Sequence, residues 1–253
     1  MDIPIKTQNE IEIMQEAGAI LGRMLQELKS KAVVGMDVWD FEEAFLKMCE
    51  DSKVRPACKS YTMHDLPPFP TGLCISLNDQ SVHCFPVKGS ILKDGDVVTL
   101  DTVIEHKGMY VDSAITFGVG KVLESDKKLM EAAEKALYES IKVIKPGIKL
   151  GLISNTMQNV VEKNGFTVLK DYAGHGIGNK MHELPEVPCY GDAEDGPIIK
   201  AGMVFAIEPL VCENEHLLVH SNNWQTKTAD GGNFVQFEHT VLVTKDGYEI
   251  LTK

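Results

Sequence analysis

The sequence predicts an α+β fold built from two similar halves, each a pair of helices followed by antiparallel strands. Apolar residues recur at helical spacing in two pairs of segments, and a strand-like stretch follows each pair. Residues 35–49 and 147–161 also place apolar side chains at equivalent positions, 112 residues apart, which suggests an internal duplication. Chance similarity between two amphipathic helices is the alternative. We expect one domain of residues 1–253, with halves of about 1–120 and 121–253.

Four helices are expected, and two of them carry clear end signals. The first begins with a capping box, because Thr7 is followed three residues later by Glu10. The fourth ends at Asn164-Gly165, a pair that favours the backbone of a helix C-terminus. The predicted helices cover residues 7–28, 37–49, 125–143 and 150–163.

The predicted strands alternate Val, Ile, Thr and aromatic residues with polar ones. They read CISLN and VVTLDTVIEHKGMYVDSAITFGVG in the first half, and MVFAIEPLV and FVQFEHTVLVT in the second. Glycine and asparagine residues punctuate them, as is typical of an antiparallel sheet.

The composition is that of an ordinary globular protein, with 43% hydrophobic and 25% charged residues. A net charge of −12 and the lack of any Lys or Arg run argue against direct nucleic-acid binding. The first residues are polar and acidic, unlike a secretory signal, and no apolar run approaches the ~18 residues of a membrane span. The six scattered cysteines form no CxxC pair, so we expect reduced thiols, no structural zinc and a cytoplasmic protein.

Two aspartates in the predicted hairpin need an explanation. EHKG is the only turn signal between Asp101 and Asp112. With His106-Lys107 as the loop the aspartates pair directly, and with Lys107-Gly108 they are near-diagonal neighbours. Both registers place the two carboxylates on one face of the sheet. Facing like charges destabilise a sheet and no Lys or Arg alternates with them, so we expect a cation there.

Two glutamates lie in strands that are otherwise apolar, Glu208 in VFAIEPLV and Glu238 in FVQFEHTVLV. A buried carboxylate without a partner would be protonated or would destabilise the fold. Each glutamate alone could pair with a buried base or lie at a solvated strand edge. Together with the aspartates and the glycine-flanked His175, they make an oxygen and nitrogen donor set suited to Mn, Fe, Co or Zn. Four carboxylates match a pair of divalent ions better than a single one.

The chain resembles the methionine aminopeptidases of the pita-bread metallohydrolases. The order Asp101, Asp112, His175, Glu208, Glu238 carries the resemblance, with TLDTVIEHKGMYVDSA, AGHGIGNKMHE, GMVFAIEPLV and QFEHTVLVT as its specific segments. The similarity runs from the first helix to the C-terminus. It implies the pita-bread fold, in which two pseudo-symmetric halves of helices pack on a curved antiparallel sheet.

The resemblance also implies roles for individual residues. Asp101, Asp112 and Glu238 would hold one divalent ion, and Asp112, His175, Glu208 and Glu238 a second. Water or hydroxide between the ions would attack the peptide bond, with Glu208 as general base. His182 would donate a hydrogen bond to the carbonyl oxygen, and His83 would contact the substrate near the scissile amide. Structural hydrogen bonding is the alternative for both of these histidines.

A methionine side chain needs an apolar pocket, and the resemblance suggests its lining residues. They are Cys58, Tyr61, Phe69, Cys74, Met181 and Trp224. Ordinary core packing is the alternative for each of them. Met181 stands where the family commonly has an aromatic residue, and residues 62–68 look like additional length.

We therefore expect a cytoplasmic, monomeric, dimetal enzyme that removes the initiator methionine from nascent chains and prefers a small second residue. Transient contact with the ribosome is part of this expectation. One alternative is a proline-specific aminopeptidase or dipeptidase, which shares the ligand order but usually carries an additional N-terminal domain. The other is a non-catalytic pita-bread protein, which typically lacks some of the ligands.

Overall fold

The computed structural model describes residues 3–63, 66–221 and 224–253. Its helices agree closely with the prediction. Thr7 caps α1, and the reciprocal bonds between Thr7 and Glu10 complete the predicted capping box. The Asp37 carboxylate accepts a hydrogen bond of 2.9 Å from the Trp39 N–H at the start of α2. The helices are α1 (Gln8–Lys31), α2 (Trp39–Ser52), α3 (Glu124–Lys142) and α4 (Gly151–Lys163).

The strands form one large antiparallel sheet and two small ones, so the fold is α+β as predicted. The large sheet has the order β1-β3-β4-β13-β8-β6-β7, with β2 also paired to β3 and β14 to β13. Its strands are β1 (Arg55–Pro56), β2 (Cys74–Leu77), β3 (Val97–His106), β4 (Met109–Gly118), β6 (Ala173–Gly176), β7 (Glu183–Pro188), β8 (Val204–Ile207), β13 (Glu238–Val243) and β14 (Tyr248–Ile250). The small sheets contain β5 (Thr167–Val168), β9 (Leu210–Cys212) and β12 (Phe234–Gln236), and β10 (Leu218–His220) with β11 (Thr226–Thr228).

The β3–β4 hairpin adopts the second of the two registers that the sequence left open. His106 pairs with Met109, so Lys107 and Gly108 form the loop. Both loop residues have positive φ, 50° and 85°, as a tight hairpin turn of this kind requires. Asp101 pairs with Ala114 and Asp112 with Val103, which makes the aspartates diagonal neighbours on one face.

The two halves repeat the same backbone contacts at the entry to their second helices. Gly35 donates to the Leu92 carbonyl at 2.9 Å, and Gly147 donates to the Ile199 carbonyl at 3.0 Å. Both glycines have φ near 90°, a region that costs other residues energy. Val38 and Leu150, at the same offset, are the N-caps of α2 and α4. These matching contacts agree with the predicted duplication and with the pita-bread arrangement of two similar halves.

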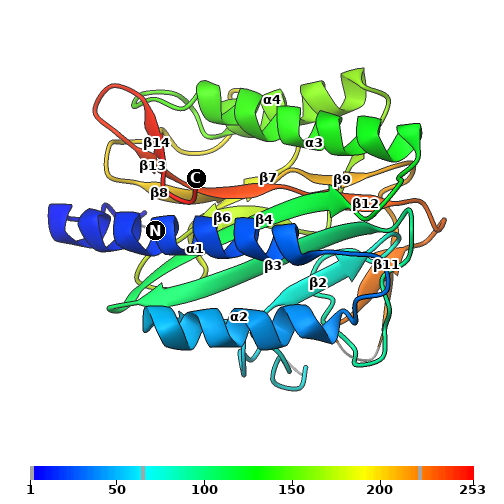
Figure 1. Cartoon of the computed structure of the whole chain (residues 1–253). Helices are drawn as coiled ribbons and strands as arrows, with labels where there is room; N and C mark the ends of the chain where they lie inside the picture. Colours follow the sequence, from blue (N-terminus) through cyan, green and yellow to red (C-terminus); the bar gives the residue numbers. More distant parts are fainter. Residues whose placement is uncertain (1–2, 64–65, 222–223) are drawn as a thin grey trace.

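Two hydrophobic cores lie mainly one in each half. Figure 1 shows α1 and α2 along the part of the large sheet that contains β2, β3 and β4, and α3 and α4 along β7 of that sheet and β9 and β12 of the three-stranded sheet. One cluster of buried residues joins Leu21, Phe41 and Leu100 of the first half, and a second joins Leu137, Met157 and Phe205 of the second. Other residues of the large sheet line the pocket described below.

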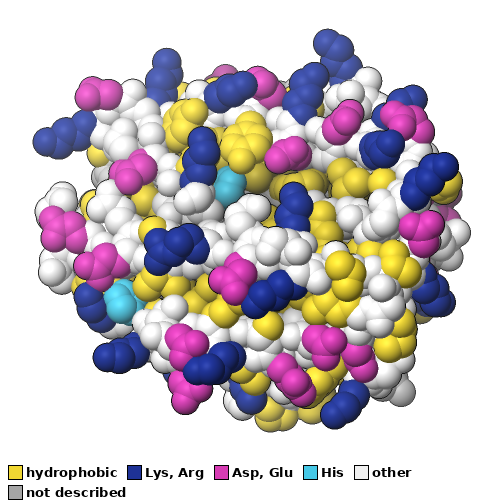
Figure 2. All heavy atoms as spheres, viewed as in Figure 1, with side chains coloured by type: hydrophobic (Ala, Val, Ile, Leu, Met, Phe, Trp, Pro, Cys, Tyr) yellow, Lys and Arg dark blue, Asp and Glu magenta, His cyan; other side chains and the backbone are white. Residues whose placement is uncertain are grey.

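The surface of the face that carries α1 is mixed in charge. Figure 2 shows basic and acidic side chains interspersed on this face, with apolar patches between them. The side chains drawn there form no continuous basic surface of the kind that binds a nucleic-acid backbone. Among the described residues, no helix combines the length and the apolar character that crossing a bilayer demands.

Candidate metal centre

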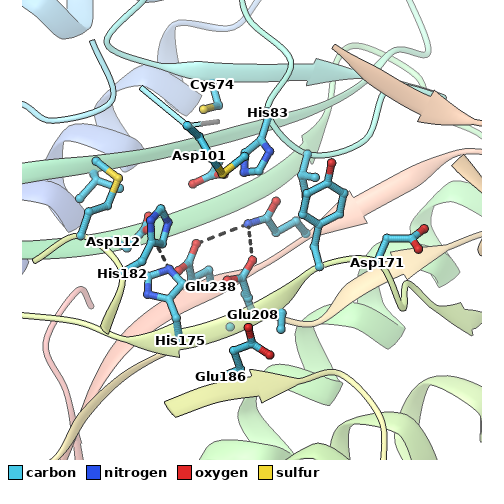
Figure 3. A pocket seen from close by; sticks show the side chains of 18 of the residues that line it. Cys74, His83, Asp101, Asp112, Asp171, His175, His182, Glu186, Glu208 and Glu238 are labelled. Carbon is cyan, nitrogen blue, oxygen red and sulfur yellow. Dashed lines mark hydrogen bonds and ion pairs between the residues drawn. The ribbon is translucent and has the colours of Figure 1, made fainter. Parts of the chain in front are cut away.

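One cavity of about 700 Å³ brings together every residue that the sequence singled out as ligand, catalytic group or pocket lining. We call Asp101, Asp112, His175, Glu208 and Glu238 the floor of this pocket. We call Cys58, Tyr61, Phe69, Cys74, Met181 and Trp224 its wall. Figure 3 shows the floor carboxylates and His175 turned toward a common centre, with His83 and His182 beside them.

Strand pairing places three acids of the floor. Asp101 on β3 and Glu238 on β13 both pair with Ala114 of β4, one from each side. Directly paired residues point to the same face, so the two carboxylates flank a small alanine side chain. Asp112, two residues before Ala114, lies on that face as well. One face of the sheet therefore gathers three acids from three strands.

Strand pairing also places the other two floor residues. His175 on β6 pairs with Ala206 of β8, and Glu208 follows two residues later on the same face. Gly174 is needed because a Cβ there would lie 2.4 Å from the Ala206 carbonyl oxygen, and one at Gly176 would lie 2.3 Å from that of Leu184. The neighbouring backbone therefore requires glycine at both positions.

Three of the floor groups lie within coordination range of one another. Ligand atoms of Asp112, His175 and Glu238 all lie within 4.8 Å of one another, and the His175 Nε2 is 3.7 Å from an Asp112 oxygen. The Gln236 amide joins Glu208 and Glu238, donating to one oxygen of each at 3.3 and 3.4 Å. Asp112, His175, Glu208 and Glu238 are all less than a tenth exposed.

Two floor oxygens lack any partner within the described residues. They are Oδ1 of Asp112 and Oε1 of Glu238, both buried. The buried Glu42 shows the opposite case, because its two oxygens accept backbone N–H groups of Gly72 and Leu73 at 2.8 and 3.0 Å. A carboxylate with a structural role is thus satisfied by the backbone, whereas the floor carboxylates face each other with free lone pairs. This donor set fits hard or borderline divalent cations.

The electrostatics of the metal-free floor are correspondingly unfavourable. Burial raises the pKa values of Asp101 and Glu238, and the charge of Asp112 raises both further. Burial raises the pKa of Glu208 to about 7, against the opposing effect of His175. Burial lowers the pKa of His175, but the hydrogen bond to Asp112 and the charges of Glu208 and Asp112 outweigh it and leave the pKa raised. Divalent cations would relieve this crowding of charge.

The two further histidines flank the floor. The Tyr61 hydroxyl lies 2.9 Å from Nδ1 of His182, and the rings of His182 and His175 are 4.5 Å apart. Desolvation together with the charge of His175 lowers the pKa of His182 to about 4. Burial likewise lowers the pKa of His83 to about 4, although the Asp112 charge acts in the opposite direction. Both rings are therefore neutral near pH 7. His83 also has φ 62°, a left-handed conformation that non-glycine residues adopt at a cost.

The wall is a connected group of rings and thiols. Trp224 stacks edge-on against Phe69 at 5.3 Å and lies 6.4 Å from Tyr61. Its indole N–H donates to the Pro67 carbonyl at 2.7 Å. Cys58, Cys74, Phe69, Met181 and Trp224 are buried. Within the predicted additional length at 62–68, residues 64–65 lie outside the described residues.

Several pocket residues were not anticipated from the sequence. Gln236 is the most important, since it joins two floor carboxylates. Its position two residues before Glu238 in an apolar strand was a usable signal. Tyr172, whose ring lies 5.1 Å from that of His83, gave no such signal. Asp171 and Glu186 lie at the edge of the pocket (Figure 3).

Known proteins share both this fold and this chain length. Residues 12–245 match metallopeptidase family M24. The chain is 37% identical over 250 residues to methionine aminopeptidase 1 of Bacillus subtilis, covering 98% of each protein. It is 40% identical over 252 residues to the methionine aminopeptidase of Clostridium perfringens, covering 99% of this chain and 98% of that one.

Solved structures give the same result. The crystal structure of methionine aminopeptidase from Thermotoga maritima matches with a TM-score of 0.96 and 40% identity, and each chain is covered completely. Prolidase from Pyrococcus furiosus shares the fold at a TM-score of 0.77 and 22% identity, over 98% of this chain and 65% of that one. Both the sequence and the pocket thus lead to one assignment: the chain belongs to metallopeptidase family M24 and, within that family, to the methionine aminopeptidases.

Proposed function

We propose that this chain is a metal-dependent aminopeptidase that removes an N-terminal methionine from proteins and prefers a small second residue. The observation that carries the proposal is the pocket itself, in which a floor of divalent-metal donors adjoins an enclosed wall of thiols and aromatic rings. The donors suit hydrolysis of a peptide bond. The wall suits an unbranched thioether side chain.

The floor would hold two divalent ions. Asp101, Asp112 and Glu238 would bind one, and Asp112, His175, Glu208 and Glu238 the other, with Asp112 and Glu238 shared. The unpartnered oxygens of Asp112 and Glu238 and the raised pKa values of Asp101 and Glu238 support cation binding at this floor. When bound, such ions polarise a carbonyl group and make water reactive near neutral pH. Co, Mn, Fe and Zn all suit these ligands.

The proton transfers fall to the Glu208 carboxylate. Glu208 lies in the floor, where its carboxylate would accept a proton from the attacking water and later deliver one to the leaving amine. His182 would donate from Nε2 to the carbonyl oxygen, because a Tyr61 hydroxyl that donates to Nδ1 leaves the ring proton on Nε2. His83, also neutral, would contact the scissile amide.

The wall would enclose the methionine side chain. Phe69 and Trp224 present ring faces and edges, and Cys58, Cys74 and Met181 present polarisable sulfur. Sulfur and aromatic contacts favour a thioether over a charged or branched side chain. A limited pocket beyond the floor would account for a small second residue.

The remaining proposals concern context. Residues 1–253 would form one catalytic domain that acts as a monomer in the cytoplasm. Its partners would be the N-termini of nascent polypeptides, with transient contact to the ribosome.

A peptide assay tests the activity. The purified chain is stripped of metal, reconstituted separately with Mn²⁺, Co²⁺, Fe²⁺ and Zn²⁺, and supplied with Met-Ala and Xaa-Pro peptides. We expect release of methionine from Met-Ala peptides and no activity in the stripped protein. Cleavage of Xaa-Pro peptides alone would identify a proline-specific enzyme. Failure to retain any divalent ion, with no cleavage, would instead identify a non-catalytic member of the family.

A further inference from the structure

A buried ion pair joins the start of the chain to the turn beside the pocket. The Lys6 ammonium lies 2.5 Å from Oε2 of Glu183, 177 residues away in the sequence. The two side chains are only 1% and 6% exposed. Lysine is almost never buried to this degree without a partner. Because a buried ion pair often adds little net stability, its presence here points to a role in placing the segment that it holds.

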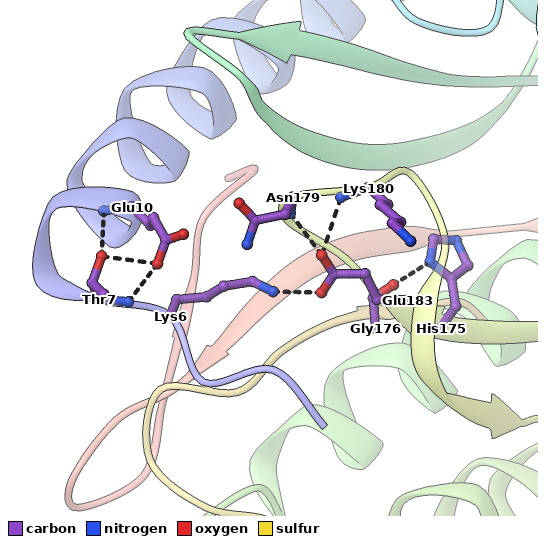
Figure 4. Close-up of polar contacts among 8 residues, drawn as sticks. All are labelled: Lys6, Thr7, Glu10, His175, Gly176, Asn179, Lys180 and Glu183. Carbon is purple, nitrogen blue, oxygen red and sulfur yellow. Dashed lines mark hydrogen bonds and ion pairs between the residues drawn. The ribbon is translucent and has the colours of Figure 1, made fainter. Parts of the chain in front are cut away.

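The partner of Lys6 organises the turn between β6 and β7. The second carboxylate oxygen of Glu183 accepts the backbone N–H groups of Asn179 and Lys180 at 2.7 and 3.0 Å. The turn therefore folds around this one carboxylate, as Figure 4 shows. Glu183 directly follows His182, so whatever fixes Glu183 also restricts His182.

The Lys6 side chain also packs against the backbone of the same turn. A Cβ at Gly178 would lie 2.1 Å from Cε of Lys6, so only glycine allows this approach. The Gly178 carbonyl accepts from the Tyr110 N–H at 2.8 Å. The Lys6 backbone N–H donates to the Gly202 carbonyl, also at 2.8 Å. Lys6 is thus anchored to the sheet while its side chain supports the turn.

The opposite side of the turn faces the pocket. Met181 is a buried member of the wall, and the His182 ring meets Tyr61 at 2.9 Å and His175 at 4.5 Å between ring centres. His175 is held separately, by its pairing with β8 and its hydrogen bond to the Gly176 carbonyl. His175 thus has contacts outside the turn, although its neighbour Gly176 pairs with Glu183.

We propose that Lys6, acting through Glu183, is a positioning residue that fixes Met181 and His182 relative to the metal floor. The inference rests on the proposed function, because it assigns Lys6 to the geometry of that reaction. The floor and the turn are thus held by different contacts. Strand pairing fixes the floor, and the buried ion pair fixes the turn that would meet the substrate.

The variant Lys6→Met removes the charge and keeps most of the side-chain length. We expect kcat on a Met-Ala peptide to fall about 100-fold, as a displacement of about 1 Å at a reacting group can cause. Bound metal, measured after reconstitution, should remain at the wild-type level. If Lys6 served stability alone, the Lys6→Met variant would have a lower melting temperature, but kcat of the folded, metal-loaded enzyme would be unchanged.

A double variant gives the rescue. Glu183→Gln keeps an oxygen to accept from Asn179 and Lys180 but carries no charge. We expect Lys6→Met/Glu183→Gln to recover at least about 10-fold in kcat over Lys6→Met, because no uncompensated charge then remains in the turn. Lys142→Met is the matched control: Lys142 pairs with Glu139 at 2.7 Å on the exposed face of α3, so wild-type kinetics are expected.

Histidine NMR decides the inference independently of activity. The chain has eight histidines, and His182→Asn identifies the imidazole signals of His182. We expect these signals to shift in Lys6→Met and to return toward wild type in the double variant. Unchanged His182 signals, or a kcat within 3-fold of wild type, would overturn the proposal. If Lys6→Met does not fold, kcat and the His182 signals are measured in Glu183→Gln and in the double variant. Wild-type values of kcat and of the His182 signals in these two variants would overturn the proposal. Failure of the proposed function would appear separately, as a wild-type protein that does not cleave methionyl peptides.

Discussion

The floor and the wall of the pocket are built in different ways. Floor residues belong to the large sheet or directly follow one of its strands, and cross-strand pairing sets their positions. Tyr61, Phe69, Met181 and Trp224 of the wall lie outside regular strands and depend on ring contacts and single hydrogen bonds. Substitutions of floor residues should therefore abolish metal binding or catalysis while the fold stays intact. Changes to the wall should shift substrate affinity in smaller steps.

The largest effect is expected at Glu208. In Glu208→Ala, turnover of a Met-Ala peptide should fall at least about 10³-fold, because the group that moves the proton is lost. Far-ultraviolet circular dichroism should be unchanged, since backbone pairing around the floor remains. Steady-state kinetics on metal-loaded protein provide the measurement.

Glu139→Ala is the control for this change, because Glu139 forms an exposed ion pair on α3 far from the floor in the sequence. It should retain wild-type turnover. A Glu208→Ala enzyme that works within 10-fold of wild type would show that another group carries the proton.

The difference in construction also explains what the sequence could predict. Carboxylates inside apolar strands are a physical anomaly, so the residue pattern alone marks Asp101, Asp112, Glu208 and Glu238 as candidate ligands. The hairpin register remained open until the positive φ angles of Lys107 and Gly108 selected one turn. Wall residues such as Phe69 and Trp224 look like ordinary core residues, and only the resemblance placed them at the pocket.

Contacts between distant segments account for what was missed. Lys6 and Glu183 are separated by 177 residues, and neither periodicity nor a motif joins them. Gln236 is polar within an apolar strand, but its contact with Glu208, 28 residues away, has no counterpart in any sequence pattern. Residues whose role depends on a partner elsewhere in the chain become visible only when the fold supplies that partner.

The second effect concerns the stability of the metal-free floor. The Glu208 pKa rises from 4.5 to about 7 on folding, so its protonated form favours the folded state. That contribution, about 3 kcal/mol, is fully present below about pH 4.5 and is lost as the pH rises through about 7. The melting temperature of the stripped protein should therefore fall by roughly 5–10 °C between pH 5 and pH 8.

Added metal and a Glu208 variant test whether the floor carboxylates cause this pH dependence. Added Mn²⁺ should raise the melting temperature more at pH 8 than at pH 5, because the ligands bind in their deprotonated form. Glu208→Gln should reduce the pH dependence of the stripped protein. A melting temperature that climbs steadily with pH in the stripped protein would contradict the raised pKa values of the floor.

The third effect is expected in the wall. Trp224→Phe removes the hydrogen bond to the Pro67 carbonyl and part of the ring surface that Phe69 contacts. KM for a Met-Ala peptide should rise about 10-fold while kcat stays within about 3-fold, because binding loses one buried hydrogen bond and some apolar contact. A fall in kcat at constant KM would mean that Trp224 contributes to the chemical step, as the floor residues do, and not to substrate binding.

The smallest effect is expected where wall and floor meet. Tyr61→Phe keeps the ring against Trp224 but removes the hydroxyl 2.9 Å from Nδ1 of His182. One hydrogen bond is worth about 1 kcal/mol, so kcat should fall about 5-fold with little change in KM. Tyr138→Phe is the matched control, because the Tyr138 hydroxyl lies 3.3 Å from Nε2 of His239, a similar pair outside the pocket. If both variants lose the same activity, the Tyr61 hydroxyl supports the fold in general; if only Tyr61→Phe loses activity, it orients His182 for the reaction.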